Sequence, residues 1–200
     1  MEKNKPYYAF PQDDSLLNGD IYNVPKDKVR VLYDGRYCAV SAFVFAVVNG
    51  KYSVLANQRG SGTPDFQGCW NCPCGFLERG EDSRHGAVRE IKEETLEIID
   101  ADALKVVYVE TEPEKCNNGN VTIRHRAFIG RQEQINKGRA WTVNHHGGGE
   151  ENEVKNVKWI PVECIDCFEW AFHHDETIQS LLPSKWKRWF IELYYSLFKK

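Results

Sequence analysis

The segment from Tyr37 to Val48 is nearly all apolar and rich in β-branched and aromatic residues, and it constrains the fold more than any other part of the chain. It ends at Asn49-Gly50, the dipeptide most typical of a two-residue hairpin turn. A second β-rich stretch, Tyr52 to Ala56, follows at once. We therefore predict two antiparallel strands joined by a tight turn.

The remaining elements follow from periodicity and turn chemistry. Further strands are predicted at 104–110, 121–130 and 154–160. A helix is predicted at about 83–96, and residues 59–72 are dense in turn formers, which predicts a loop. Strands outnumber helices and the connections favour a mixed sheet, so we expect an α/β (α+β) fold.

Length and composition set the domain organisation. The 200 residues suit one domain with appendages, which we place as an N-terminal arm at 1–35, a domain at 36–182 and a C-terminal helix at 183–200. The net charge of -3 offers no general attraction for nucleic acid.

The C-terminal segment predicts an amphipathic helix that begins at Pro183-Ser184. Large apolar residues recur there every three or four positions: Trp186, Trp189, Phe190, Leu193, Tyr194, Leu197 and Phe198. Lysines and an arginine occupy the other side, which leaves a membrane surface or RNA open. We expect instead that the helix docks on the protein's own core or on a partner in a homodimer.

The cellular setting is expected to be cytoplasmic, without membrane contact. The charged N-terminus leads into no apolar signal segment, and no run of 18 apolar residues occurs. Seven cysteines in such a chain are expected to be reduced thiols. A four-thiolate zinc site is the alternative. It would draw on Cys69, Cys72, Cys74, Cys164 and Cys167.

The predicted helix at 83–96 carries the chemistry. Its apolar residues form one stripe, and an adjoining arc carries the carboxylates Glu90, Glu93, Glu94 and Glu97. Like charges at this spacing repel, and they lie toward the end of the helix that already disfavours negative charge. A bound cation would compensate for both effects.

Oxygen ligands without histidine or thiolate at helical spacing suit a hard ion such as Mg²⁺ or Mn²⁺. Such an ion activates water and neutralises charge on a leaving phosphate. The alternative is a solvated acidic face paired with Arg84, Arg89 and Lys92.

The spacing around this helix resembles the signature of the Nudix hydrolases. Gly75, five residues, Glu81, seven residues, and then Arg89-Glu90-Ile91-Lys92-Glu93-Glu94 agree in register with it. The resemblance covers about residues 37–182 and implies a Nudix-like α/β/α sandwich with a mixed sheet. It also implies Mg²⁺- or Mn²⁺-dependent hydrolysis of a nucleoside diphosphate linked to another group.

The resemblance implies roles for individual residues. Glu90, Glu93, Glu94 and the Gly75 carbonyl would hold the metal, with Glu93, Glu94 and Arg89 in the catalytic set. Arg89 would orient the carboxylates, and Glu81 would brace the loop. In many relatives a further glutamate precedes the last strand, and we prefer Glu151 over its neighbours at 150 and 153 for this catalytic role.

Three residues are candidates for substrate binding. Arg59 would either hold a phosphate or pair with an acid. Trp70 and Phe66 would stack on a base, although a tryptophan beside a sheet more often lies in the core. Histidines 145, 146, 173 and 174 are expected to face solvent.

The sequence departs from the family pattern at two positions. The glycine that normally ends the helix is absent, because Leu96 follows Thr95. Cys74 stands where many members have glycine. The first departure affects the end of the helix and lies beyond the predicted ligands, whereas Cys74 would narrow the approach to the metal.

The expected substrate is a nucleotide diphosphate derivative (NDP-X). ADP-ribose, a nucleotide sugar, a dinucleoside polyphosphate, an oxidised nucleoside triphosphate or a capped RNA end would all fit. Nucleic acid is otherwise not expected as a partner. The alternative is a non-catalytic module that senses nucleotides or binds a partner on the same fold.

Overall fold

The computed structural model describes residues 37–78, 80–112, 120–134 and 152–198, together with the backbone of two short strands near the N-terminus. These two strands, β1 (Pro6–Ala9) and β2 (Arg30–Tyr33), pair antiparallel with each other. The chain divides into two compact units, Met1–Arg36 and Tyr37–Lys200. All elements described below belong to the second unit.

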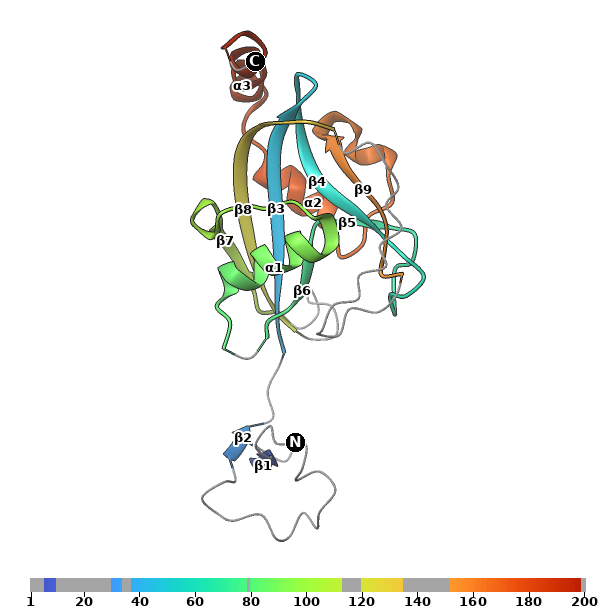
Figure 1. Cartoon of the computed structure of the whole chain (residues 1–200), viewed down its shortest axis with the longest axis vertical. Coiled ribbons are helices and arrows are strands. Elements are labelled where there is room, and N and C mark those ends of the chain that lie inside the picture. Colours follow the sequence, from blue (N-terminus) through green and yellow to red (C-terminus); the bar gives the residue numbers. More distant parts are fainter. Residues whose placement is uncertain are drawn as a thin grey trace. The chain divides into compact units, whose positions relative to one another are not determined.

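A seven-stranded mixed sheet organises this unit (Figure 1). Its strands are β3 (Cys38–Val48), β4 (Lys51–Arg59), β5 (Trp70–Asn71), β6 (Cys74–Phe76), β7 (Lys105–Glu110), β8 (Val121–Gln132) and β9 (Val154–Pro161). The main order is β5-β4-β3-β8-β7, with β6 paired to β3 and β9 paired to β4. The β3–β8 pair is parallel and the others are antiparallel, so the predicted mixed sheet is confirmed.

The predicted hairpin forms at Asn49-Gly50, where Val48 pairs with Lys51. Both turn residues have positive φ, 50° and 76°, as a type I′ turn requires. The turn thereby fixes the register of the two central strands.

Helices cover both faces of the sheet. On one face, Ala87 and Ile91 of α1 (Ser83–Thr95) join a core with alternate β3 residues such as Val40 and Val44. On the other face, Phe43 and Phe45 of β3 pack with Ile178 of α2 (His174–Leu181). The 3-10 helix Val162–Cys167 covers the same face as α2. The result is the expected α/β/α sandwich.

Two of the elements that differ from the sequence prediction are β5 and α2. The predicted loop at 59–72 contains β5, because Trp70 and Asn71 pair with Gln58 and Asn57 of β4. The helix α2 was not predicted, since its eight residues include two apolar side chains, Ile178 and Leu181. Both depend on tertiary partners rather than on local propensity.

The helix α3 (Lys185–Phe198) begins where Pro183-Ser184 predicted, with Ser184 accepting a backbone bond from Arg188. It lies at the hairpin end of the sheet (Figure 1). Its Glu192 carboxylate accepts a hydrogen bond from the Tyr52 backbone N–H at 2.8 Å, and the Tyr195 ring packs edge-on against Phe128. The helix thus contacts its own domain through one side.

Candidate active site

The local sequence defines both ends of α1. The Asp82 side chain accepts hydrogen bonds from the backbone N–H groups of Arg84 and His85, so Asp82 caps the N-terminus. At the other end Leu96 adopts a left-handed conformation with φ 57° and donates its N–H to the Lys92 carbonyl. Leucine therefore takes the cap conformation that glycine supplies in the family pattern.

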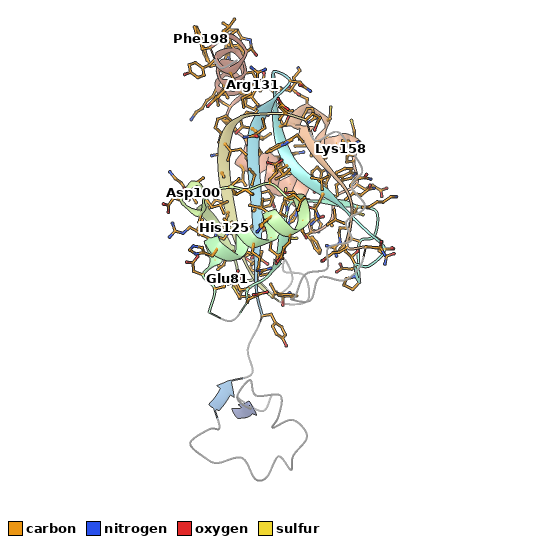
Figure 2. The ribbon with its side chains drawn as sticks, viewed as in Figure 1. Glu81, Asp100, His125, Arg131, Lys158 and Phe198 are labelled. Atoms are coloured by element: carbon orange, nitrogen blue, oxygen red, sulfur yellow. The ribbon has the colours of Figure 1, made fainter. Side chains whose placement is uncertain are left out.

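Arg89 is the hub of the acidic cluster on α1. Its guanidinium donates to Glu81 at 3.0 Å and 3.1 Å, to Glu90 at 2.8 Å and to Glu93 at 2.9 Å. A further bond, at 2.8 Å, reaches the carbonyl of Phe76, the last residue of β6. Arg89 therefore ties three carboxylates to the end of that strand. Figure 2 shows Glu81 at the start of α1.

Glu90 lies against the backbone of β6. It is 8% exposed, and a β-carbon added to Gly75 would overlap its carboxylate. Glycine is thus the residue that lets the carboxylate approach the strand. Burial raises the pKa of Glu90 to about 7, although the Arg89 guanidinium lowers it.

Glu94 is the most completely buried carboxylate of the set, at 5% exposed. It accepts a hydrogen bond from the Cys74 backbone N–H at 3.1 Å, and no arginine or lysine of the described chain forms an ion pair with it. Burial raises its pKa well above the usual range, and the nearby Glu90 and Glu153 carboxylates raise it further. Glu94 is the clearest uncompensated acid in the site.

Glu153, which directly precedes β9, brings a carboxylate from a distant part of the sequence close to this cluster. Its backbone carbonyl accepts a bond from the Gly60 N–H at 2.7 Å, and a β-carbon on Gly60 would overlap Asn152. Its charge raises the pKa of both Glu90 and Glu94. Glu151, the preferred candidate from sequence, lies outside the described residues, as does the neighbouring glycine-rich segment.

Arg59 is held beside the acidic cluster by Asp65. Two guanidinium nitrogens donate to Asp65, at 2.6 Å to its carboxylate and 3.0 Å to its carbonyl. The guanidinium also lies 4.9 Å from the centre of the Phe172 ring and lowers the pKa of Glu94. Arg59 therefore pairs with an acid, which is one of its two predicted roles.

Phe66 contributes an exposed aromatic surface near Arg59. Its ring is 45% exposed and packs edge-on against Phe172 at 5.0 Å. Both residues have positive φ, 48° and 59°, which is strained for a phenylalanine. Phe172 was missed in the sequence, where an unusual backbone conformation leaves no signal.

Trp70 lies in the second core cluster with 6% of its surface exposed. Its ring packs against Phe168, and its backbone N–H donates to the Glu169 carbonyl. Little of the ring surface is therefore exposed to a ligand. A stacking role for Trp70 stays a prediction that burial does not favour.

The expectation that His174 faces solvent was wrong. The side chain is 3% exposed, and its Nδ1 accepts a hydrogen bond from the Cys72 backbone N–H at 3.0 Å. Burial lowers the pKa of His174 to about 3, with Arg124 and Arg59 lowering it further. His174 therefore braces the strand connection that leads to Gly75.

The donor set fits a hard divalent cation. Glu90 and Glu94 are buried carboxylates that repel each other, and Gly75 admits the Glu90 carboxylate to the place where a β-carbon would lie. The carboxylate oxygens of Glu90 and Glu94 are donors of the kind that Mg²⁺ or Mn²⁺ prefers. Within the described ranges, no three His, Cys, Asp or Glu side chains already converge on one point.

The sandwich and the acidic helix packed against Gly75 define a protein of the Nudix type. The chain belongs to the Nudix family, because the family model of the NUDIX domain matches residues 39–181. In sequence the chain is similar to Nudix hydrolase 2 of Arabidopsis thaliana, with 28% identity over 144 residues. This match covers 72% of the chain and 46% of that protein, so the chain spans about half the length of this relative.

Solved structures show the same fold. The NUDIX domain of Shewanella oneidensis NrtR, complexed with ADP ribose, has a TM-score of 0.57 at 21% identity and covers 85% of this chain and 96% of its own. A MutT/nudix family protein from Enterococcus faecalis has a TM-score of 0.50 at 25% identity, covering 64% of this chain and 44% of its own. A bifunctional NMN adenylyltransferase/ADP ribose pyrophosphatase from Francisella tularensis, complexed with AMP and a Mn ion, has a TM-score of 0.51 at 23% identity. Here 74% of this chain and 41% of that chain are covered.

Proposed function

We propose that this chain is a Mg²⁺- or Mn²⁺-dependent hydrolase that cleaves the diphosphate linkage of a nucleoside diphosphate derivative, such as ADP-ribose or a nucleotide sugar. The observation that carries the proposal is the burial of Glu90 and Glu94 against Gly75 with too few cations to compensate them. Such an arrangement costs stability unless a ligand repays it. Membership of the Nudix family and the nucleotides bound by similar folds support the same chemistry.

Glu90, Glu93, Glu94 and the Gly75 carbonyl are the proposed metal ligands. The bound ion would supply an activated water and neutralise charge on the departing phosphate. Arg89 fixes Glu90 and Glu93 in position through its two bonds from one nitrogen. Because each carboxylate accepts from that nitrogen with one oxygen, its second oxygen can bind the cation.

A carboxylate outside the ligand set would hold the proton that the attacking water loses. Glu153 is our first choice, since its charge acts on both Glu90 and Glu94 and Gly60 fixes its backbone. Glu151 stays a second candidate from its position before β9. Single substitutions of the two residues by glutamine separate these assignments.

Substrate recognition is assigned to the group formed by Arg59, Phe66 and Phe172. The exposed Phe66 ring offers a flat apolar surface to a base or sugar. The guanidinium of Arg59, close to Glu94, supplies positive charge for a phosphate of the substrate. The strained backbone at Phe66 and Phe172 is typical of residues held for function. A cytoplasmic setting would supply such nucleotides.

The test is turnover by the full chain with Mg²⁺ and a panel of substrates. The panel contains ADP-ribose, a nucleotide sugar, a dinucleoside polyphosphate, an oxidised nucleoside triphosphate and a capped RNA, with products separated by ion-exchange chromatography. We expect Glu94→Gln to lower kcat by at least about a hundredfold. Glu163→Gln is the matched control, since that side chain is 51% exposed and pairs with Lys51.

Two results would contradict the proposal. Equal turnover by Glu94→Gln and the unsubstituted chain would contradict the assignment of Glu94 as a metal ligand. Nucleotide binding measured by calorimetry, without turnover of any panel member, would favour the nucleotide-sensing module instead.

A further inference from the structure

The helix α3 presents a large apolar surface that its own domain does not cover. Its half-buried residues, Arg188, Ile191, Glu192 and Tyr195, all lie on one side of the helix. The opposite side is exposed, with Trp186 at 75% and Phe190 at 60%. We call this side the aromatic face. It consists of Trp186, Trp189, Phe190, Leu193, Tyr194 and Leu197.

The aromatic face is large enough to mark a binding surface. From the exposed fractions, these side chains present roughly 700–800 Å² to solvent, more than the largest apolar patch of a typical monomer. An area of this size would satisfy either a protein partner or the surface of a bilayer. Area alone therefore does not identify the occupant.

The charges around the aromatic face favour a bilayer surface over a protein partner. Lys185 and Lys187 are exposed on the helix, and two further lysines follow it in the sequence. The one acidic residue of the helix, Glu192, turns toward the domain and accepts a bond from the Tyr52 N–H. Two copies that joined through this face would bring unneutralised cations together, whereas anionic headgroups would neutralise them.

Neighbouring parts of the domain lie close to the helix. Gly50 and Gly130 lie against Ser196 and Tyr195 of α3, and Lys51, which follows Gly50, is paired with Glu163. Figure 2 shows Arg131 at the end of the sheet nearest α3 and Phe198 at the outer end of the helix. The chain as a whole carries a net charge of -3, so the positive charge here is local.

The length of α3 bears on whether the helix would cross a bilayer or lie on its surface. Every helix in the described part of the chain is too short or too polar to cross a membrane. An amphipathic helix with tryptophans on one side and lysines at its margins lies instead in the plane of the interface.

We propose that α3 is a surface anchor whose aromatic face inserts among the headgroups and upper acyl chains of an anionic lipid bilayer. The acidic cluster lies near Val40, at the start of β3, whereas α3 lies beyond Val48 at its end. These two residues are roughly 25 Å apart along an extended strand. Docking through α3 thus leaves the acidic cluster open to water.

The test is co-sedimentation of the full chain with vesicles of phosphatidylcholine, with and without phosphatidylglycerol. We expect at least about tenfold stronger partition into the anionic vesicles, reduced by added salt. Trp186→Glu and Phe190→Glu should each weaken this partition about tenfold or more. Ile98→Glu is the matched control, because that side chain is 81% exposed outside α3 and should leave partition unchanged.

Three outcomes would overturn the proposal. The first is equal or absent partition into the two kinds of vesicle. The second is partition that Trp186→Glu leaves unchanged while circular dichroism shows a folded chain. The third is a dimer by light scattering that Trp186→Glu splits into monomers, which would assign the aromatic face to a second copy.

Discussion

Gly75 and Glu90 are in direct contact across the α1–β6 boundary, and the carboxylate of Glu90 occupies the space into which a β-carbon of residue 75 would project. Any side chain at residue 75 must therefore displace a proposed metal ligand. The contact links the strand's backbone to the geometry of the site.

The first prediction is that Gly75→Ala destabilises the protein by about 1–3 kcal/mol, the usual cost of an overpacked site. Turnover should fall together with stability, since Glu90 must move. Urea denaturation gives the free energy of unfolding. The shorter acid in Gly75→Ala/Glu90→Asp should restore part of the stability, and a double variant no more stable than Gly75→Ala would contradict this account.

The second prediction concerns the Arg89 hub. Arg89→Lys should cost about 2 kcal/mol of unfolding free energy, because an ammonium group cannot reach three carboxylates and the Phe76 carbonyl together. Arg84→Lys is the control, since its 3.7 Å pair with Asp102 is exposed and should change stability by less than about 0.5 kcal/mol. Equal effects in the two variants would argue against the hub.

The third prediction is that Glu94→Gln stabilises the metal-free protein at pH 7.5 by about 1–3 kcal/mol. Burial raises the pKa of Glu94, so the ionised form that predominates in the unfolded chain is disfavoured in the folded one. The contribution of Glu94 to stability is therefore largest in acid and is lost as the pH rises above the ordinary carboxyl pKa. Glutamine removes this dependence and can still accept the bond from the Cys74 N–H.

Thermal unfolding with and without Mg²⁺ checks this third prediction. The ion should raise the Tm of the unsubstituted chain more than that of Glu94→Gln. A larger Mg²⁺ effect on the variant would contradict the ligand assignment.

The fourth prediction follows from the buried His174. Its folded pKa of about 3 lies below the ordinary value near 6.5, so the unfolded chain takes up a proton that the folded chain excludes. Stability should fall as the pH drops below 6.5, with a contribution from His174 of up to about 1.4 kcal/mol per pH unit. His174→Asn, which retains an acceptor, should lose this slope between pH 6.5 and about 4.5, as measured by urea denaturation.

His173→Asn is the control for the fourth prediction. The His173 side chain is 81% exposed, and this variant should keep the slope of the unsubstituted chain. A His174→Asn variant with an unchanged slope would show that the buried imidazole is not its source.

The fifth prediction concerns the left-handed cap at Leu96. A leucine at φ 57° is strained, and the side chain is 40% exposed, so little packing depends on it. Leu96→Gly should therefore raise the free energy of unfolding by about 0.5–1 kcal/mol. Glu97→Gly, at a residue without positive φ, should lower it by a similar amount. Destabilisation by Leu96→Gly would contradict the strain argument.

The sequence predicted those elements whose signals are local. Asn49-Gly50 specified its hairpin, and the spacing from Gly75 to Glu94 specified both α1 and the family. These patterns work because turn geometry and helical periodicity act over a few residues.

The unpredicted features depend on partners far away in the sequence. β5 exists because Trp70 meets β4, and His174 is buried because it accepts a bond from Cys72, 102 residues earlier. The backbone contact between Gly60 and Glu153, whose charge acts on Glu90 and Glu94, is likewise a pairing of distant residues. Periodicity carries no information about such distant pairings.

The backbone hydrogen bond from Gly60 to Glu153 also bears on how much the preceding segment, 135–151, can vary. On the far side of segment 135–151, Gln134 exchanges two hydrogen bonds of 3.0 Å with the Trp159 backbone. Both flanks of that segment are therefore anchored to the sheet independently of what joins them. We therefore expect insertions, deletions or replacement between these anchors to leave Glu90, Glu94 and Glu153 in their positions.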